Sequence, residues 1–262
     1  MNFCPLYSGS SGNSMYIKSK ETCLLIDAGR SVRDIERALL SVGASGKIDG
    51  ILVTHEHTDH IKSVGAISRK YDVPVYANEY TFGAMEKNVG DIPLKNIRIF
   101  NTEQDFFIKD ICVYPFSIPH DAADPVGFCL ESGGKKISVL TDLGYMPQRL
   151  YDIVHKSNVM LIESNHDIKM LQTGPYPQFL KRRILGTRGH LSNDAAADAL
   201  LKIYDKGVGQ VILGHLSEKN NTVRKAVETV MQVLRTNGVS CDLMVAGTTP
   251  GAFRLNPEAA AL

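Results

Sequence analysis

Four potential metal ligands lie within one short run of the chain, Thr54-His55-Glu56-His57-Thr58-Asp59-His60. The run follows an apolar strand-like segment, 51–53, and precedes a helical pattern, 61–71. A strand that ends in a tight loop can turn His55 and His57 toward one point, and Asp59 and His60 toward a second point nearby. Imidazole and carboxylate ligands without thiolate suit zinc, manganese or iron, and positions left open for water are typical of catalytic sites. The first hypothesis is therefore a pair of adjacent divalent cations.

The spacing separates this run from other histidine motifs. In the helical HExxH motif of zinc proteases the two histidines are four residues apart on one helix face, which His55 and His57 are not. A polar surface loop that happens to be rich in histidine is the other interpretation, but it gives no packing reason for the cluster.

A site for two metals needs ligands from elsewhere in the chain, and three candidates follow apolar, strand-like runs. His120 follows 111–118, Asp142 follows 137–140, and His215 follows 211–213. Taken singly, each has an ordinary structural interpretation, as a histidine at a strand end or as a turn-forming aspartate before Gly144. Together with the histidine-rich loop they predict one shared site.

The loop fits the HxHxDH signature of the metallo-β-lactamase superfamily, which it therefore resembles. The resemblance implies that His55, His57 and His120 hold one metal, that Asp59, His60 and His215 hold a second, and that Asp142 bridges them at a metal separation of roughly 3.5–4 Å. Such a pair of metals activates water for hydrolysis at neutral pH. Asp27 resembles the family's early aspartate, which supports the ligand loop by accepting hydrogen bonds. A plain turn-forming aspartate before Gly29 is the alternative.

Glu163 and His190 resemble a catalytic pair of the phosphodiesterase branch of this superfamily, in which the histidine protonates the departing oxygen. An alkoxide is a poor leaving group, so cleavage benefits from a general acid, and a carboxylate behind an imidazole raises its pKa and orients it. With Asp59 these two residues form the predicted catalytic set. The alternatives are a solvated carboxylate for Glu163 and, for His190, a residue at a helix start, because Ser192 is a predicted N-cap.

The order of motifs along nearly the whole chain resembles the bacterial YycJ/WalJ group. The motifs are Ser8 to Ser14, Glu163 to Asp167, Gly174 to Pro177, Gly189 to Asn193 and Gly214 to Ser217. The resemblance implies a metal-dependent exonuclease on DNA, with 5′-to-3′ polarity. Only 143–189 separate Asp142 from His190, which leaves no room for the large cap domain of some related nucleases. The interval between His120 and Asp142 lacks the extended arm of transfer-RNA maturases, which disfavours transfer RNA as the substrate, and the resemblance to the group favours DNA over RNA.

Three other functions stay open at this point: a phosphodiesterase for small or cyclic nucleotides, a thioesterase of the glyoxalase II type, and a regulatory or scaffolding module that retains the metal site.

Several residues are candidates for substrate contact. The Gly/Ser loop with Ser10, Gly12 and Asn13 could form a backbone nest around a phosphate, although a flexible turn is nearly as good an interpretation. The basic run 181–183, with Arg183, could follow a nucleic-acid backbone, and a solvated helix face explains it equally well. His166 follows Glu163 closely, and Tyr176 could stack on a base or pack against the protein.

Composition sets the remaining bounds. The chain has 262 residues, 44% of them hydrophobic, which favours a single domain over 1–255, with 256–262 expected to be a disordered tail. The net charge of +1 gives no global attraction to nucleic acid, so DNA binding must come from a local basic surface. Five cysteines without paired spacing indicate a reducing compartment, and no secretory or membrane-spanning segment is apparent. We therefore expect a cytoplasmic protein with no membrane association and no obligate protein partner.

Strand-like and helical patterns alternate along the chain. The predicted strands are 15–17, 23–26, 51–53, 75–77, 97–100, 106–118, 126–131, 137–140, 159–162, 211–213 and 242–245, and the predicted helices are 32–42, 61–71, 79–88, 147–155, 175–185, 193–206 and 223–236. These patterns indicate the α/β class. Two sheets with helices outside, the four-layer αββα sandwich, accommodate them, and the family resemblance favours that architecture.

Overall fold

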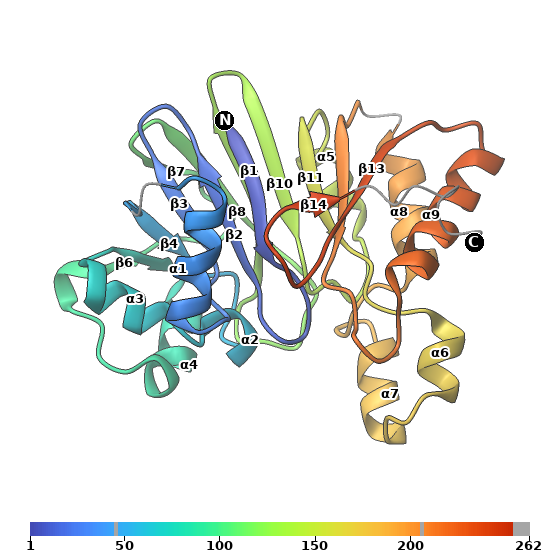
Figure 1. Ribbon diagram of the computed structural model, residues 1–262, viewed down its shortest axis with the longest axis horizontal. Coiled ribbons are helices and arrows are strands. Elements are labelled where there is room, and N and C mark those ends of the chain that lie inside the picture. The colour runs from blue at the N-terminus through green and yellow to red at the C-terminus, as the bar shows by residue number, and fades with distance from the viewer. Residues whose placement is uncertain (45–46, 205–206, 254–262) are drawn as a thin grey trace.

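Two β-sheets form the centre of the molecule in the computed structural model, which describes residues 1–44, 47–204 and 207–253. The first sheet has the strand order β1-β2-β3-β4-β5-β6, and the second has the order β14-β13-β12-β11-β10-β9-β8-β7. Helices lie on the outer side of each sheet (Figure 1). The predicted α/β class and αββα architecture are confirmed. The predicted tail, 256–262, lies outside the described residues, and the single domain over 1–255 stays a prediction.

The strands of the first sheet are β1 (Asn2–Tyr7), β2 (Ser14–Lys18), β3 (Cys23–Ile26), β4 (Gly50–Leu52), β5 (Val75–Ala77) and β6 (Ile97–Ile99). Those of the second are β7 (Phe106–Ile108), β8 (Ile111–Ser117), β9 (Val126–Ser132), β10 (Lys135–Leu140), β11 (Val159–Glu163), β12 (Gln210–Gly214), β13 (Asp242–Ala246) and β14 (Ala252–Phe253). The helices are α1 (Val32–Ser41), α2 (Thr58–Ile61), α3 (Val64–Tyr71), α4 (Glu79–Val89), α5 (Gln148–Ile153), α6 (Ile168–Thr173), α7 (Gln178–Leu185), α8 (Asn193–Tyr204) and α9 (Val223–Thr236), with a 3₁₀ turn at Leu94–Asn96.

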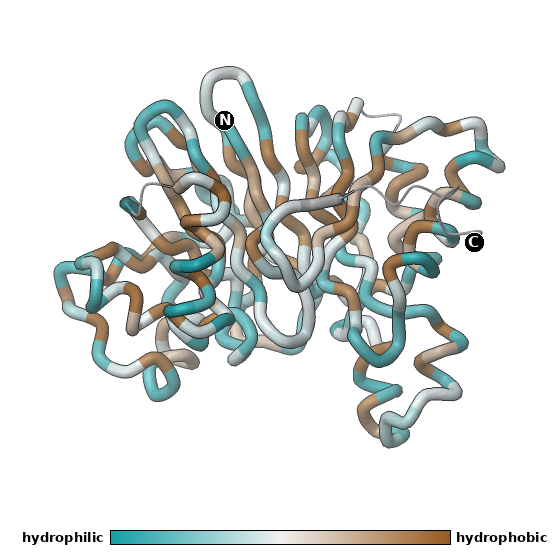
Figure 2. Tube along the Cα trace, viewed as in Figure 1, coloured by the Kyte–Doolittle hydropathy of each residue, from teal (hydrophilic) through white to brown (hydrophobic). Residues whose placement is uncertain are grey.

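The alternation of side chains along each strand builds three apolar layers. In β2, Met15 and Ile17 face the second sheet, where they meet residues such as Phe128 of β9, while Tyr16 faces the helices. One outer layer packs the first sheet against α1, α3 and α4, and the other packs the second sheet against α5, α8 and α9. The apolar residues accordingly follow the strands at the centre of the molecule (Figure 2).

Parallel pairing brings the carboxyl ends of several strands to one edge. Strands β3 to β6 are parallel, as are β10 to β13. Strand β8 runs in the direction of β10, because both pair antiparallel to β9. Loops that follow β3, β4, β8, β10, β11 and β12 therefore meet at the same end of the sandwich, where ligand sites of such sheets are found.

The structure divides two predicted elements. The run 106–118 is a hairpin of β7 and β8 rather than one strand, because Lys109 adopts a positive φ of 51° at the turn. The helix 61–71 is split into α2 and α3. The sequence patterns missed β1, the short β14 and the short α6, and the helix expected over 175–185 begins at Gln178.

No helix among the described residues combines the length and the apolarity that crossing a membrane requires.

The layer between the sheets generates a stability prediction. Phe128 is fully buried there, whereas Phe107 of β7 is 69% exposed. We expect Phe128→Ala to lower the free energy of unfolding by about 3–5 kcal/mol, because it leaves a cavity between two sheets. The matched change Phe107→Ala should stay within about 0.5 kcal/mol. Urea denaturation measures both, and equal losses would contradict the layer as described.

Candidate metal centre

Three of the predicted site residues have left-handed backbones within two residues of the end of a strand. They are Asp27 after β3, Asp142 after β10 and His215 after β12, with φ values of 60°, 61° and 54°. This region is uncommon for residues other than glycine, and such backbones cluster at functional sites. In each case the turn directs a polar side chain into the space between the two sheets' carboxyl ends.

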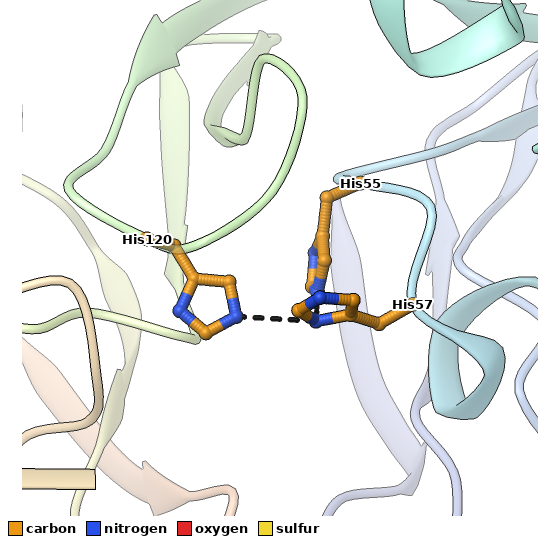
Figure 3. Close-up of side chains that lie close together, drawn as sticks. All are labelled: His55, His57 and His120. Atoms are coloured by element: carbon orange, nitrogen blue, oxygen red, sulfur yellow. Dashed lines mark hydrogen bonds between the residues drawn. The ribbon is translucent and has the colours of Figure 1, made fainter. Parts of the chain in front are cut away.

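The first group of ring nitrogens comes from both sheets. His55 and His57 lie on the loop after β4, and His120 lies on the loop after β8, facing them (Figure 3). Nε2 of His55 lies 3.0 Å from Nδ1 of His57, which lies 3.3 Å from Nε2 of His120. Three potential ligand atoms therefore surround one point.

The second group lies beside the first. Oδ2 of Asp59 is 3.5 Å from Nε2 of His60 and 3.7 Å from Nε2 of His215. Asp142 lies between the groups, with Oδ2 at 3.2 Å from Nε2 of His60 and Oδ1 at 3.8 Å from Nε2 of His120. The structure thus brings together all seven predicted ligands.

These distances fit divalent cations. Ligand atoms 2.0–2.2 Å from a tetrahedral zinc ion lie about 3.3–3.6 Å from one another, and the observed separations are 3.0–3.8 Å. Oδ2 of Asp142 and Nε2 of His215 are buried and have no hydrogen-bond partner among the described residues. Because buried polar atoms are normally paired, both atoms are suited to a cation. The donor set, nitrogen and carboxylate oxygen without sulfur, suits zinc, manganese or iron.

The pKa values differ between the groups. Burial holds the pKa of His55 well below its usual value and lowers that of His120, so these rings are neutral and available as ligands. Burial alone would lower the pKa of His215, but the charge of Asp142, the nearby carboxylate of Asp59 and the hydrogen bond to Glu163 raise it to about 10. Burial also acts to lower the pKa of His60, but the negative charges of Asp142, Asp59 and Asp27 outweigh it and raise that pKa. The carboxylates around the second group therefore favour a bound positive charge.

Asp27 supports the first loop from behind. Its carboxylate, fully buried, accepts hydrogen bonds from the backbone N–H of Thr54 at 2.9 Å, from the Thr54 hydroxyl at 2.8 Å and from Nδ1 of His60 at 2.7 Å. The last bond leaves Nε2 of His60 directed toward Asp59 and Asp142. Orientation of a ligand imidazole by a carboxylate is the usual supporting interaction at metal sites.

Glu163, the last residue of β11, supports the second sheet's histidines as Asp27 supports His60 in the first. Oε1 accepts hydrogen bonds from Nδ1 of His190 at 2.8 Å and from Nδ1 of His215 at 2.7 Å. Oε2 accepts the backbone N–H groups of Leu143 and Leu191. Burial opposes ionisation, but the charges and hydrogen bonds of His190 and His215 lower the pKa of Glu163 to about 2. The carboxylate is thus ionised, and its charge raises the pKa of His190 against the effect of burial.

Asp142, Glu163, His190 and His215 also lie close enough to form a further group of potential ligands. We interpret this group as a hydrogen-bonded cluster and not as a metal site, because both oxygens of Glu163 already accept hydrogen bonds from N–H donors. His190 is 20% exposed at its side chain, and Asp59 is 29% exposed, so both face the open side of the site.

The predicted substrate contacts are spread around this centre. Asn13 is buried, and its Nδ2 lies 3.3 Å from Oδ2 of Asp59. Gly12 lies in the same loop with a φ of 145°, and a Cβ there would approach Gly29 O within 2.7 Å. Ser10 is exposed, and Tyr176 is half-buried.

His166 and Arg183 complete the predicted contacts. His166 is 1% exposed, and neither ring nitrogen has a hydrogen-bond partner among the described residues. Burial lowers its pKa to about 4. Arg183 is exposed and forms an ion pair with Asp121, next to His120.

Sequence reasoning missed several supporting groups. Thr54 links Asp27 to the ring of His55, with 3.0 Å between its Oγ1 and Nδ1 of His55. Gly189 O accepts from Nδ1 of His120 at 3.1 Å, and Ser8 Oγ accepts the N–H of His215 at 2.8 Å. The link from Glu163 to His215 was also missed. Only the position of Thr54 beside the motif carried a signal, since the others depend on long-range contacts.

Two central sheets with helices outside, and a cluster of imidazole and carboxylate groups at their carboxyl ends, define a metallo-β-lactamase fold. A family model described as the β-lactamase superfamily domain matches residues 22–216, and the chain belongs to that superfamily. Within it, the chain is similar to the exodeoxyribonuclease YycJ of Bacillus anthracis, with 41% identity over 91% of this chain and 90% of the relative. It is also similar to the exodeoxyribonuclease WalJ of Streptococcus pneumoniae strain D39, with 39% identity over 94% and 93%.

Solved structures show the same fold at low identity. Zinc-bound PqqB from Methylobacterium extorquens aligns with a TM-score of 0.74 and 15% identity, over 97% of this chain and 100% of that one. YhfI from Bacillus subtilis aligns with a TM-score of 0.70 and 15% identity, over 95% and 98%.

The hydrogen bonds of Asp27 generate a prediction on metal binding. Asn has nearly the same shape as Asp and tolerates a positive φ, so Asp27→Asn should preserve the turn while weakening the orientation of His60. We expect metal affinity to fall about 10–100-fold, as measured by chelator competition and by metal content. Asp110→Asn is the control, because Asp110 accepts bonds from Thr22 and Ser19 far from the site. Unchanged affinity in Asp27→Asn would contradict this supporting role.

Proposed function

We propose that this protein is a dinuclear metal-dependent exonuclease that hydrolyses phosphodiester bonds of DNA. The observation that carries the proposal is the pairing of His190 with a buried, ionised Glu163 directly beside the seven converging donors. A hydrolase that expels an alkoxide benefits from such a proton donor. Relatives at 39–41% identity over most of the chain are named exodeoxyribonucleases, which supports DNA as the substrate.

In this proposal His55, His57 and His120 hold one divalent cation, Asp59, His60 and His215 hold the other, and Asp142 contributes to both. Zinc, manganese and iron each suit these donors. A bound pair of such cations supplies activated water at neutral pH and neutralises the charge of the reacting phosphate.

The protein's own groups then have distinct roles. Asp59, on the open side, helps hold the second cation where the phosphate approaches. The charge of Glu163 favours the protonated form of His190, and the partly exposed ring donates the proton to the departing oxygen. Glu163 fixes both His190 and His215 through one oxygen, so the proton donor and a metal ligand keep a constant separation.

Ser10, Gly12, Asn13, His166, Tyr176 and Arg183 remain proposed substrate contacts. His166 has the strongest support, because buried polar atoms are normally paired and both of its ring nitrogens lack a hydrogen-bond partner among the described residues. A bound substrate would provide one. We also propose 5′-to-3′ polarity and a cytoplasmic location, the latter supported by five free cysteines.

The substrate class is tested with metal-loaded protein and 5′- or 3′-labelled single- and double-stranded DNA and RNA. We expect stepwise release of nucleotides from DNA 5′ ends, complete loss with a chelator, and recovery on adding zinc or manganese. Asp142→Asn, which can keep the positive φ, should lower the rate at least about 100-fold. Turnover restricted to small phosphodiesters or to thioesters would overturn the proposal, as would DNA binding without any metal-dependent cleavage.

The role of His190 is tested by the leaving group. We expect His190→Ala to slow DNA cleavage about 10²–10⁴-fold, because an alkoxide leaves slowly without protonation. Hydrolysis of bis(p-nitrophenyl) phosphate should fall far less, since nitrophenolate leaves without help. Equal losses on the two substrates would contradict a proton-donor role and indicate that His190 acts through the metal site.

A further inference from the structure

Helices α6 and α7 form a hairpin between Glu163 and His190, the two residues of the proposed proton-donor pair. The hairpin extends from the end of the second sheet, at the same end of the molecule as α2, which carries Asp59 and His60 (Figure 1). It is anchored by Leu171 and Ile184, which are buried, and by Lys181, whose Nζ donates to Gln172 O at 2.7 Å. Lys181 therefore serves the hairpin itself, because a cation at the end of α6 satisfies a terminal carbonyl.

One face of α7 is exposed and unusual in composition. Phe179, Arg182 and Arg183 are three and four residues apart, so they share a face of the helix. The Phe179 side chain is 70% exposed, and Arg182 is exposed with no acidic partner among the described residues. A large exposed ring beside unpaired positive charge contributes little to folding, which indicates a surface for binding.

The charge of the hairpin is strongly one-sided. Residues 168–193 contain five basic side chains, Lys169, Lys181, Arg182, Arg183 and Arg188, and no acidic one, in a chain with 29 basic and 28 acidic residues. A local basic segment in a nearly neutral protein attracts a polyanion to that segment alone. This is the local basic surface that binding to nucleic acid requires.

The exposed face of α7 is continuous with the candidate metal centre. Arg183 pairs with Asp121, and Oδ1 of that aspartate lies 3.5 Å from Nε2 of His120. Arg188 Nε donates to His120 O at 3.0 Å. A nucleic-acid strand bound along α7 would therefore reach the loop that carries His120, a proposed metal ligand.

We propose that this face of α7 binds the single-stranded end of a DNA substrate, with a base stacked on Phe179 and phosphates held by Arg182. The inference rests on the proposed nuclease function and adds a strand preference to it. An exposed aromatic ring favours single strands because their bases are free to stack, whereas the bases of a duplex are stacked already. Arginine beside the ring neutralises the backbone regardless of sequence.

Binding is measured without cleavage, by fluorescence anisotropy of metal-loaded full-length protein with a labelled phosphorothioate oligonucleotide, single-stranded or duplex. We expect the single strand to bind more tightly. Phe179→Ala should weaken single-strand binding about tenfold, with an unchanged dependence on salt. Arg182→Gln should reduce the slope of log affinity against log salt by about 0.7, the value for one phosphate contact on a single strand.

Matched controls are available in the chain. Phe107, 69% exposed on β7, is the control for Phe179, and Arg235, exposed in the last turn of α9, is the control for Arg182. Phe107→Ala and Arg235→Gln should bind DNA as the unmodified protein does. Affinity losses that are equal in Phe179→Ala and Phe107→Ala would overturn the inference.

Two further outcomes separate the possibilities. If the α7 variants bind DNA normally but sediment less with vesicles of anionic phospholipid, the face contacts membranes and the inference is wrong. If the α7 variants lose single-strand binding while the unmodified protein cleaves no DNA, the inference is supported and the proposed nuclease function fails instead.

Discussion

Concentrated negative charge at the junction of the two sheets is the constraint on which the site depends. Asp27, Asp142 and Glu163 are buried, and Asp59 adds a fourth carboxylate, only partly exposed. Burying charge is costly unless it is paired, so these groups require compensating positive charge. Imidazole N–H groups provide part of it, and this is why the pKa of His215 rises to about 10. Two divalent cations would carry four positive charges, which match the four carboxylates.

Each sheet contributes one carboxylate that orients a histidine of the second group of donors. Asp27 follows β3 and orients His60, while Glu163 ends β11 and orients His215. Each also accepts backbone N–H groups of neighbouring loops, that of Thr54 in the case of Asp27 and those of Leu143 and Leu191 in the case of Glu163. The relative placement of the two groups of donors therefore depends on how the sheets pack, and the apolar layer between them is part of the site's geometry.

The sequence predicted the fold class and four of the donors from local patterns, since alternating apolar residues indicate strands and a His-rich loop after a strand indicates ligands. The other three donors, His120, Asp142 and His215, were predicted from their positions after strand-like runs together with the family resemblance. What the sequence did not predict depends on contacts across the molecule: the bond from Glu163 to His215 joins residues 52 apart, and that from His120 to Gly189 joins residues 69 apart. Strand β1 was missed because only its pairing with β2 identifies it.

The exposure of individual side chains on α7 is another property that depends on contacts across the molecule. In the sequence, a solvated helix face explains the basic run 181–183 as well as a nucleic-acid contact does. In the structure Lys181 is buried, and the neighbouring Phe179, which no sequence pattern singled out, is 70% exposed. The short hairpin packs through Leu171 and Ile184, which leaves Phe179 on the face that also carries Arg182 and Arg183. Affinity for a polyanion can therefore arise at the metal site of a chain whose net charge is only +1.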